Sequence, residues 1–298
     1  MGMGKRFFLF TTVNLLLLIT ISITFNLLGI RPYLNARGID YQLLMAFCLV
    51  WGIGGAFISL ALSRIMAKWM LGVKVIDPNT PEPELAWLVE TVHNLAKAAN
   101  LPKMPEVGYY PSPEVNAFAT GPTKSRALVA VSAGLLGSLN KQQVEGVLGH
   151  EIAHVANGDM VMMTLIQGVI NAFVMFLARV IAFFLVRGSS DRGGSTMTRW
   201  LVTIALEIVL SILCMPVVAA FSRRREFRAD AGGAKLAGRE KMINALEGLT
   251  RTVQQADLTH NRSLAALKIS SKPKGTLFAL FATHPPLETR IERLKQIV

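Results

Sequence analysis

The stretch His150-Glu151-Ile152-Ala153-His154 lies near the middle of this 298-residue chain. On an α-helix, residues four apart lie one turn above each other on the same face, so the two histidines can offer nitrogens to one metal ion. Glu151 then projects beside them, where a metal-bound water would lie. This spacing is typical of zinc-dependent peptide hydrolysis with the glutamate as general base. The structural alternative is a pair of histidines that cap or pack on a helix.

The composition indicates a membrane protein with a polar portion. The residues are 52% hydrophobic and 17% charged, and the mean hydropathy of +0.43 is too apolar for an ordinary soluble enzyme. The net charge of +12 could suit nucleic acid, but no basic stretch is combined with a recognition motif. Many lysines and arginines instead flank apolar runs, which suits an anionic membrane surface. We therefore expect the lipid bilayer, and no nucleic acid, as a partner.

Four apolar runs are long enough to cross a bilayer, which takes about 20 residues as a helix. They pair into two hairpins, residues 7–28 with 41–63 and residues 160–186 with 200–221. Basic residues precede the first run, but that run is too long for a cleaved signal peptide. By the positive-inside rule, basic residues at the hairpin ends place both termini and the polar segments in the cytoplasm. These residues are Lys5, Arg6, Arg64, Lys68, Lys74, Arg223, Arg224, Arg225 and Arg228.

Arg179 and Glu207 are the lone charges inside the third and fourth runs. Each lies eight residues from an arginine, Arg187 or Arg199, that marks the outer end of its run. Antiparallel helices then place both charges at one depth, where pairing offsets the cost of burying them. The alternative is that Arg179 reaches out to the interface and Glu207 is protonated.

The two cysteines, Cys48 and Cys214, lie inside apolar runs. Neither stands at metal-ligand spacing from a histidine, and two such cysteines imply no disulfide framework. We therefore expect each to be a small buried hydrophobic residue.

The polar segments combine α and β patterns. An apolar helical pattern runs from Leu85 to Ala96, and β-type stretches follow at 106–110 and 127–132. A helix from the N-cap Asn140 to Asn157-Gly158 then carries the two histidines. The expected domains are an N-terminal transmembrane hairpin (1–74), an α+β segment (75–159), a second transmembrane hairpin (160–221) and a helical segment (222–298).

A catalytic zinc takes three protein ligands and leaves one position open, so a third side chain is needed. The extended motif with glycine at 157 and histidine at 160 is excluded, because this chain has Asn157 and Met160. A distant carboxylate must serve instead. Glu145 and Asp159 each lie five residues outside the nearest histidine, which turns them away from the metal-facing side.

Glu226 and Asp230 are the better candidates, because they lie four residues apart on one helical face. Glu226 could bind the metal, and Asp230 could accept a hydrogen bond from the other nitrogen of a ligand histidine. An isolated pair with this spacing more often belongs to a solvated helix face.

Three segments carry a resemblance to a known family: HEIAHVANGD at 150–159, SRRREFRAD at 222–230 and THPP at 283–286. Over nearly its whole length, the chain closely resembles the HtpX family of bacterial inner-membrane zinc proteases, distant relatives of the CaaX prenyl-protein endopeptidases. The resemblance implies one Zn²⁺ per subunit with His150, His154 and Glu226 as ligands and Glu151 as the catalytic residue.

The expected fold is a mainly α membrane protein with four transmembrane helices and a small cytoplasmic α+β catalytic domain of the zincin, gluzincin-like type. The resemblance implies a location in the bacterial inner membrane, with the catalytic site and both termini in the cytoplasm. It also implies membrane-protein substrates, namely misfolded or damaged chains removed in quality control and the stress response. It implies no particular oligomeric state.

Two further segments are candidates for contacts with substrate. His284, in the turn before Pro285-Pro286, could donate a hydrogen bond to the oxyanion or to the substrate, although a histidine with a structural role in the turn is equally open. Asn116-Ala117-Phe118 could form an edge strand that pairs with an extended substrate. As plain sequence, the same segment is equally a core strand.

Two other classes of function remain open from the sequence. A non-catalytic membrane scaffold could retain a zinc site, although neither Glu151 nor a third ligand is missing. A transporter is suggested by the intramembrane charges Arg179 and Glu207. The polar portion and the absence of a visible inverted repeat in the sequence argue against a transporter.

Overall fold

The structure is a computed structural model that describes residues 34–35, 38–187, 196–258 and 279–296. The first predicted span, 7–28, lies outside the described residues. The chain divides into two compact units. Of the described residues, 34–35, 38–59, 164–187 and 196–218 belong to the apolar unit, and 60–163, 219–258 and 279–296 belong to the sheet unit. Each unit is described by itself.

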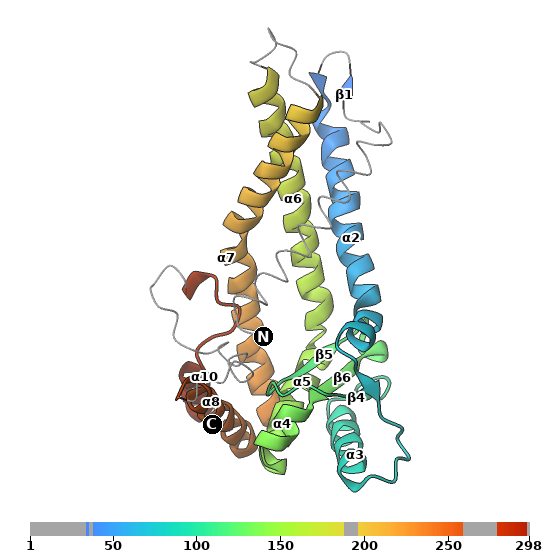
Figure 1. Cartoon of the computed structure of the whole chain (residues 1–298), viewed down its shortest axis with the longest axis vertical. Helices are drawn as coiled ribbons and strands as arrows, with labels where there is room; N and C mark the ends of the chain where they lie inside the picture. Colours follow the sequence, from blue (N-terminus) through green and yellow to red (C-terminus); the bar gives the residue numbers. More distant parts are fainter. Residues whose placement is uncertain (1–33, 36–37, 188–195, 259–278, 297–298) are drawn as a thin grey trace. The chain divides into compact units, whose positions relative to one another are not determined.

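Three long helices contribute to the apolar unit: α2 (Tyr41–Met70), α6 (Asp159–Arg187) and α7 (Thr196–Ala237). All three are long and apolar enough to cross a membrane (Figure 1). They contain the second, third and fourth predicted runs, but α7 continues beyond Phe221, where the fourth run ends, to Ala237. The carboxylates predicted near the metal therefore lie on the same helix as the fourth run.

The predicted pairing of Arg179 with Glu207 is confirmed within the apolar unit. The Nη1 atom of Arg179 on α6 donates to the Oε1 atom of Glu207 on α7 at 2.8 Å, and both side chains are buried. The same nitrogen donates to the carbonyl of Met175 at 3.0 Å. The alternative, in which Arg179 reaches out to the interface, is therefore wrong.

The same unit contains the two cysteines, which are both free. Cys48 is fully buried, as expected, whereas Cys214 is only half-buried. Close packing of α2 on α6 occurs at Gly52, where a Cβ atom would lie 2.6 Å from the backbone nitrogen of Ala172. A glycine is needed there because any side chain would meet that backbone.

The sheet unit contains a four-stranded sheet in the order β3-β4-β6-β5. Its strands are β3 (Lys74–Val75), β4 (Glu106–Tyr110), β5 (Ala117–Thr120) and β6 (Leu128–Ser132). Strands β4 and β6 are parallel, and the other pairs are antiparallel. The predicted strands at 106–110 and 127–132 are confirmed, apart from Ala127, which precedes the first residue of β6. Within the described ranges, strand β5 lies at an edge of this sheet, as the edge-strand alternative expects.

Side chains alternate between the two faces of the sheet. One face, with Val107, Val129 and Val131, packs against α3 (Pro83–Ala98) and α5 (Lys141–Asn157) in the main hydrophobic core. The other face, with Leu128 and Ala130, packs in a smaller cluster near the end of α2. The remaining described elements are β1 (Leu34–Asn35), β2 (Gly38–Ile39), η1 (Lys124–Arg126), α4 (Ala133–Ser138), α8 (Arg239–Leu258) and α10 (Leu287–Gln296).

Helix α5 has the ends that the sequence predicts. The Asn140 side chain accepts from the Gln143 N–H, and the Gln143 side chain accepts from the Asn140 N–H, each at 3.0 Å. This reciprocal cap satisfies two backbone donors that the first helical turn leaves free. At the other end, Gly158 has φ 70°, and its N–H donates to helix carbonyls. The helix that carries both motif histidines is therefore sharply bounded.

Candidate metal centre

Helices α5 and α7 cross closely beside the two motif histidines. A Cβ atom on Gly233 of α7 would lie only 2.9 Å from the backbone nitrogen of His150, so a glycine permits this approach. Glu226 and Asp230 precede Gly233 by seven and three residues, which places them on the same face of α7. The crossing therefore brings both carboxylates to the motif.

Three side chains converge with their donor atoms in one place. The Nε2 atoms of His150 and His154 are 3.1 Å apart. Glu226 completes the triangle, with Oε2 at 3.4 Å from the first nitrogen and Oε1 at 3.4 Å from the second. The exposed fractions of the three side chains are only 10%, 12% and 1%.

These separations suit a tetrahedral metal ion. Ligand atoms about 2.0–2.1 Å from zinc lie about 3.3 Å from one another, close to the observed edges of the triangle. The buried Oε2 atom of Glu226 also makes no regular hydrogen bond within the described residues, although His284 Nδ1 lies 2.8 Å away. Two imidazoles and one carboxylate are donors that zinc prefers. The residues therefore fit the group that the sequence motif implies.

Glu151 lies beside this triangle and faces the edge of the sheet. Its Oε2 atom accepts a hydrogen bond of 2.9 Å from the backbone N–H of Ala119 on β5. Within the described part of the chain, β5 pairs with β6 on one side only, so this N–H belongs to the open edge. The carboxylate expected to act as the base therefore lies next to an edge strand.

The outer nitrogen of His150 contacts a carboxylate held by an arginine. Nδ1 of His150 lies 3.0 Å from Oδ1 of Asp230. Asp230 accepts two hydrogen bonds from Arg290 of α10, from Nε at 2.8 Å and from Nη2 at 2.5 Å. Asp230 thus lies where its predicted role requires, whereas Arg290 has no signal in the sequence, because it is far away in the last helix.

The outer nitrogen of His154 has an equivalent contact. Its Nδ1 atom lies 2.7 Å from Oδ2 of Asp159, whose Oδ1 accepts from Arg228 Nη2 at 3.0 Å. The spacing of Asp159 from the nearest histidine argues against it as a ligand, and Asp159 is no part of the triangle. Its contact with the back of the ring was not predicted. The available signal was its position just after Gly158, where the chain turns back past His154.

The electrostatics of the triangle favour a bound cation. Burial lowers the pKa of His150, but hydrogen bonds with Asp230 and Glu226 outweigh it and raise the pKa to about 9. Burial raises the pKa of Glu226, but the charge of His284 and hydrogen bonds with the other histidines hold it well below its usual range. The group of carboxylates thus attracts positive charge, and a metal ion must displace a proton from His150 to bind.

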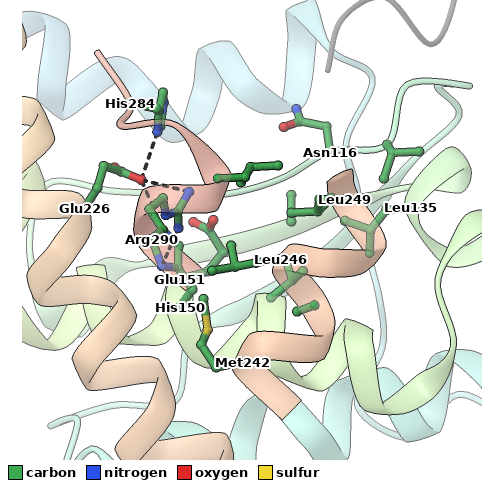
Figure 2. A pocket seen from close by; sticks show the side chains of 15 residues that line it. Asn116, Leu135, His150, Glu151, Glu226, Met242, Leu246, Leu249, His284 and Arg290 are labelled. Carbon is green, nitrogen blue, oxygen red and sulfur yellow. Dashed lines mark hydrogen bonds and ion pairs between the residues drawn. The ribbon is translucent and has the colours of Figure 1, made fainter. Parts of the chain in front are cut away.

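Of the residues predicted to contact substrate, some line the pocket beside the metal triangle and one does not. Figure 2 shows His284 pointing to Glu226, while Asn116, the residue before β5, approaches the same pocket. Ala117 also lines the pocket. Phe118 does not, because side chains alternate along a strand and its ring packs on Tyr110 at the other face, with centroids 5.8 Å apart.

Comparisons with known proteins agree with this geometry. Residues 82–298 match Peptidase family M48. "Protease HtpX homolog" of Methylacidiphilum infernorum (isolate V4) is 51% identical over 99% of this chain and 99% of that protein. "Protease HtpX homolog" of Bacillus subtilis (strain 168) is 48% identical over 98% and 99%. The crystal structure of S. mikatae Ste24p has a similar fold, with a TM-score of 0.59 and 18% identity over 85% of this chain and 58% of that one. The predicted resemblance to HtpX is confirmed.

Proposed function

Because this chain belongs to peptidase family M48 and is a membrane metalloprotease, we propose that it is a zinc endopeptidase with one Zn²⁺ per subunit. His150, His154 and Glu226 are the proposed ligands, and Glu151 is the proposed general base. The observation that carries this assignment is the triangle of donor atoms with edges of 3.1 and 3.4 Å. The segments 75–159 and 222–298 together supply these residues and form the proposed protease domain.

Each side chain has a defined part in hydrolysis. His150, His154 and Glu226 would hold the zinc ion, which would supply Lewis acidity for the activation of water when bound. Glu151 accepts the proton of the attacking water and delivers it to the leaving nitrogen. Asp230 and Asp159 accept hydrogen bonds from the Nδ1 atoms of His150 and His154, so that both Nε2 lone pairs point into the triangle.

The proposed substrate lies extended along β5. In the proposed substrate-binding segment Asn116-Ala117-Phe118, the backbone of Ala117 would pair with the peptide, since main-chain hydrogen bonds at a sheet edge bind a peptide without regard to its side chains. The N–H and C=O of Asn116 contact Ser132, and Phe118 faces β6 in the same way, so these two residues would contribute their side chains rather than their backbone. His284 is the proposed donor to the oxyanion. Its side chain is 32% exposed, more than those of the three ligand residues.

The proposed location is the bacterial inner membrane, with the catalytic site and both termini in the cytoplasm. Positive flanks support this orientation, above all the run from Arg223 to Arg228 after the fourth apolar run. His154 and Glu226 each lie within six residues of an apolar run in the sequence. Misfolded or damaged membrane proteins are therefore the proposed substrates.

The test separates metal binding from chemistry. In purified protein in detergent, Glu151→Gln should retain one zinc per chain yet lose activity on an unfolded protein by roughly 10²–10⁴-fold. His154→Ala should lose both. Glu247→Gln, a change on α8 outside the site, serves as the control and should alter neither property.

The same assay decides between an enzyme and a scaffold. An enzyme loses its cleavage activity when a chelator is added and regains it with zinc. A scaffold binds zinc and never cleaves. Full activity of the Glu151→Gln protein would end the assignment of that residue as the base.

A further inference from the structure

A cavity opens beside Glu151, and its far wall is hydrocarbon. The cavity has a volume of about 120 Å³. In Figure 2, Glu226 and His150 lie on one side of it and Leu246, Leu249 and Leu135 on the other, with Glu151 between them. The apolar wall includes Leu135 of α4, Val147 of α5, and Met242, Leu246 and Leu249 of α8.

The size of this cavity suits one large apolar side chain. Protein interiors are normally close-packed, so a space of this kind next to a reactive group is a binding feature. A cavity of roughly 150 Å³ lined by apolar side chains holds a molecule the size of benzene. The space here is similar, so a leucine, methionine or phenylalanine side chain matches it.

The charged groups around the cavity are already engaged with one another. Arg290 makes both of its short contacts to Asp230. Glu151 accepts from Ala119, and His150 and Glu226 belong to the metal triangle. His284, which also lines the cavity, contacts Glu226. Within the described residues, each charged or ionisable side chain that lines the cavity thus already has a partner on the metal side of the site. Selection must come from the apolar wall.

The edge strand explains how a side chain reaches this space. Ala117 of β5 and the preceding Asn116 line the cavity, and the N–H of Ala119 on the same strand donates to Glu151. A peptide paired with β5 directs alternate side chains to the same face as Ala117. One such side chain, adjacent to the bond that the water deprotonated by Glu151 attacks, points at the leucines.

We infer that this cavity selects the residue next to the scissile bond. The protease then cuts beside leucine, methionine or phenylalanine, which are abundant in the spans of misfolded membrane proteins. This inference rests on the proposed function, because it assigns a pocket of that same site.

The test alters the wall at Leu249, which is only half-buried and tolerates change better than its fully buried neighbours. A peptide library with one randomised region is digested in detergent, and the cut sites are read by mass spectrometry. The wild type should favour leucine, methionine or phenylalanine at one position flanking the cut. Leu249→Ala should shift the choice toward phenylalanine and tryptophan, and Leu249→Phe toward alanine and valine. Each shift should be about tenfold, as for one methylene or more in an apolar pocket.

Leu236→Ala and Leu236→Phe are the matched controls, since Leu236 packs against the same core without lining the cavity. Both should keep the wild-type cut sites. Stoichiometric zinc binding identifies variants that have folded. Wild-type cleavage without preference, or identical cut sites in wild type and both Leu249 variants, overturns the inference.

A binding assay separates this inference from the proposed function. Glu151→Gln protein is titrated with pentapeptides that differ only in a central leucine or alanine. Binding of the leucine peptide should be at least tenfold tighter, whether or not the wild type turns over. Equal affinities refute the cavity assignment, whereas a wild type that cleaves no peptide refutes the proposed function alone.

Discussion

The two units of this protein each bury charged side chains, but their balances of charge differ. In the apolar unit, the buried Arg179 forms an ion pair with the buried Glu207. In the sheet unit, three buried carboxylates converge, those of Asp159, Glu226 and Asp230. One buried guanidinium, that of Arg290, contacts two of these carboxylates.

This difference in charge balance indicates which of the two groups of buried charged side chains requires a bound ligand. A buried pair of opposite charges compensates itself, so it can serve structure alone. A group with more buried carboxylates than buried cations lowers its energy by binding a proton or a metal ion. Hydrogen bonds with Asp230 and Glu226, two of these carboxylates, outweigh burial and raise the pKa of His150 to about 9. A surplus of buried negative charge thus marks the candidate site, and a neutral pair does not.

The largest expected effect comes from removing one of the two charges in the Arg179–Glu207 pair. Arg179→Leu or Glu207→Leu alone leaves a buried charge without its partner and should lower the free energy of unfolding by about 3–5 kcal/mol. The double change to leucine should recover much of that loss. Unfolding in mixed detergent micelles measures both quantities.

Thr203→Val is the control for this cycle, because the Thr203 hydroxyl donates only within its own helix, to the carbonyl of Arg199. It should have little effect. If the two single losses simply add in the double variant, the pair does not interact and the comparison between the units fails.

A smaller effect should come from adding zinc to the protein. Free zinc at 100 times its Kd should stabilise the native state by about 2.7 kcal/mol. Amide exchange should slow in α5 of the sheet unit and change much less around Arg179 in α6. The His154→Ala protein should show neither response. Equal slowing in α5 and in the middle of α6 would mean that zinc does not act through the triangle.

The smallest effect concerns the carboxylates behind the histidines. Asp159→Asn and Asp230→Asn should each weaken zinc binding by about 10–100-fold while Glu151 stays in place. Competition with a chromogenic chelator measures the affinity. Glu145→Gln, which alters only a surface ion pair with Lys241, is the control. If both aspartate variants bind zinc with wild-type affinity, the contacts of these carboxylates with the histidines do not contribute to metal binding.

Local patterns were enough to predict much of the architecture. The apolar runs predict the helices α2, α6 and α7, because their length and composition suit a bilayer whatever surrounds them. The cap residues Asn140 and Gly158 predict the ends of α5, since capping depends on neighbours within four residues. The depth of Arg179 and Glu207 follows from helical rise alone.

Spacing also indicated part of the metal site. His150 and His154 share a face by helical periodicity, as do Glu226 and Asp230. The choice of Glu226 over other carboxylates needed the family resemblance, because helix geometry relates residues only within one helix.

Only the tertiary structure brings together residues that no helical or strand periodicity relates. Arg290 reaches Asp230 from the last helix, and Ala119 meets Glu151 from an edge strand. The cavity wall combines α4, α5 and α8. Such contacts depend on how helices cross and on small residues such as Gly233 at the crossing. Packing between residues far apart in the sequence leaves no pattern within a local stretch of sequence. The amino-acid pattern thus determined the helices and their charged positions, whereas packing determined which distant side chains share a site.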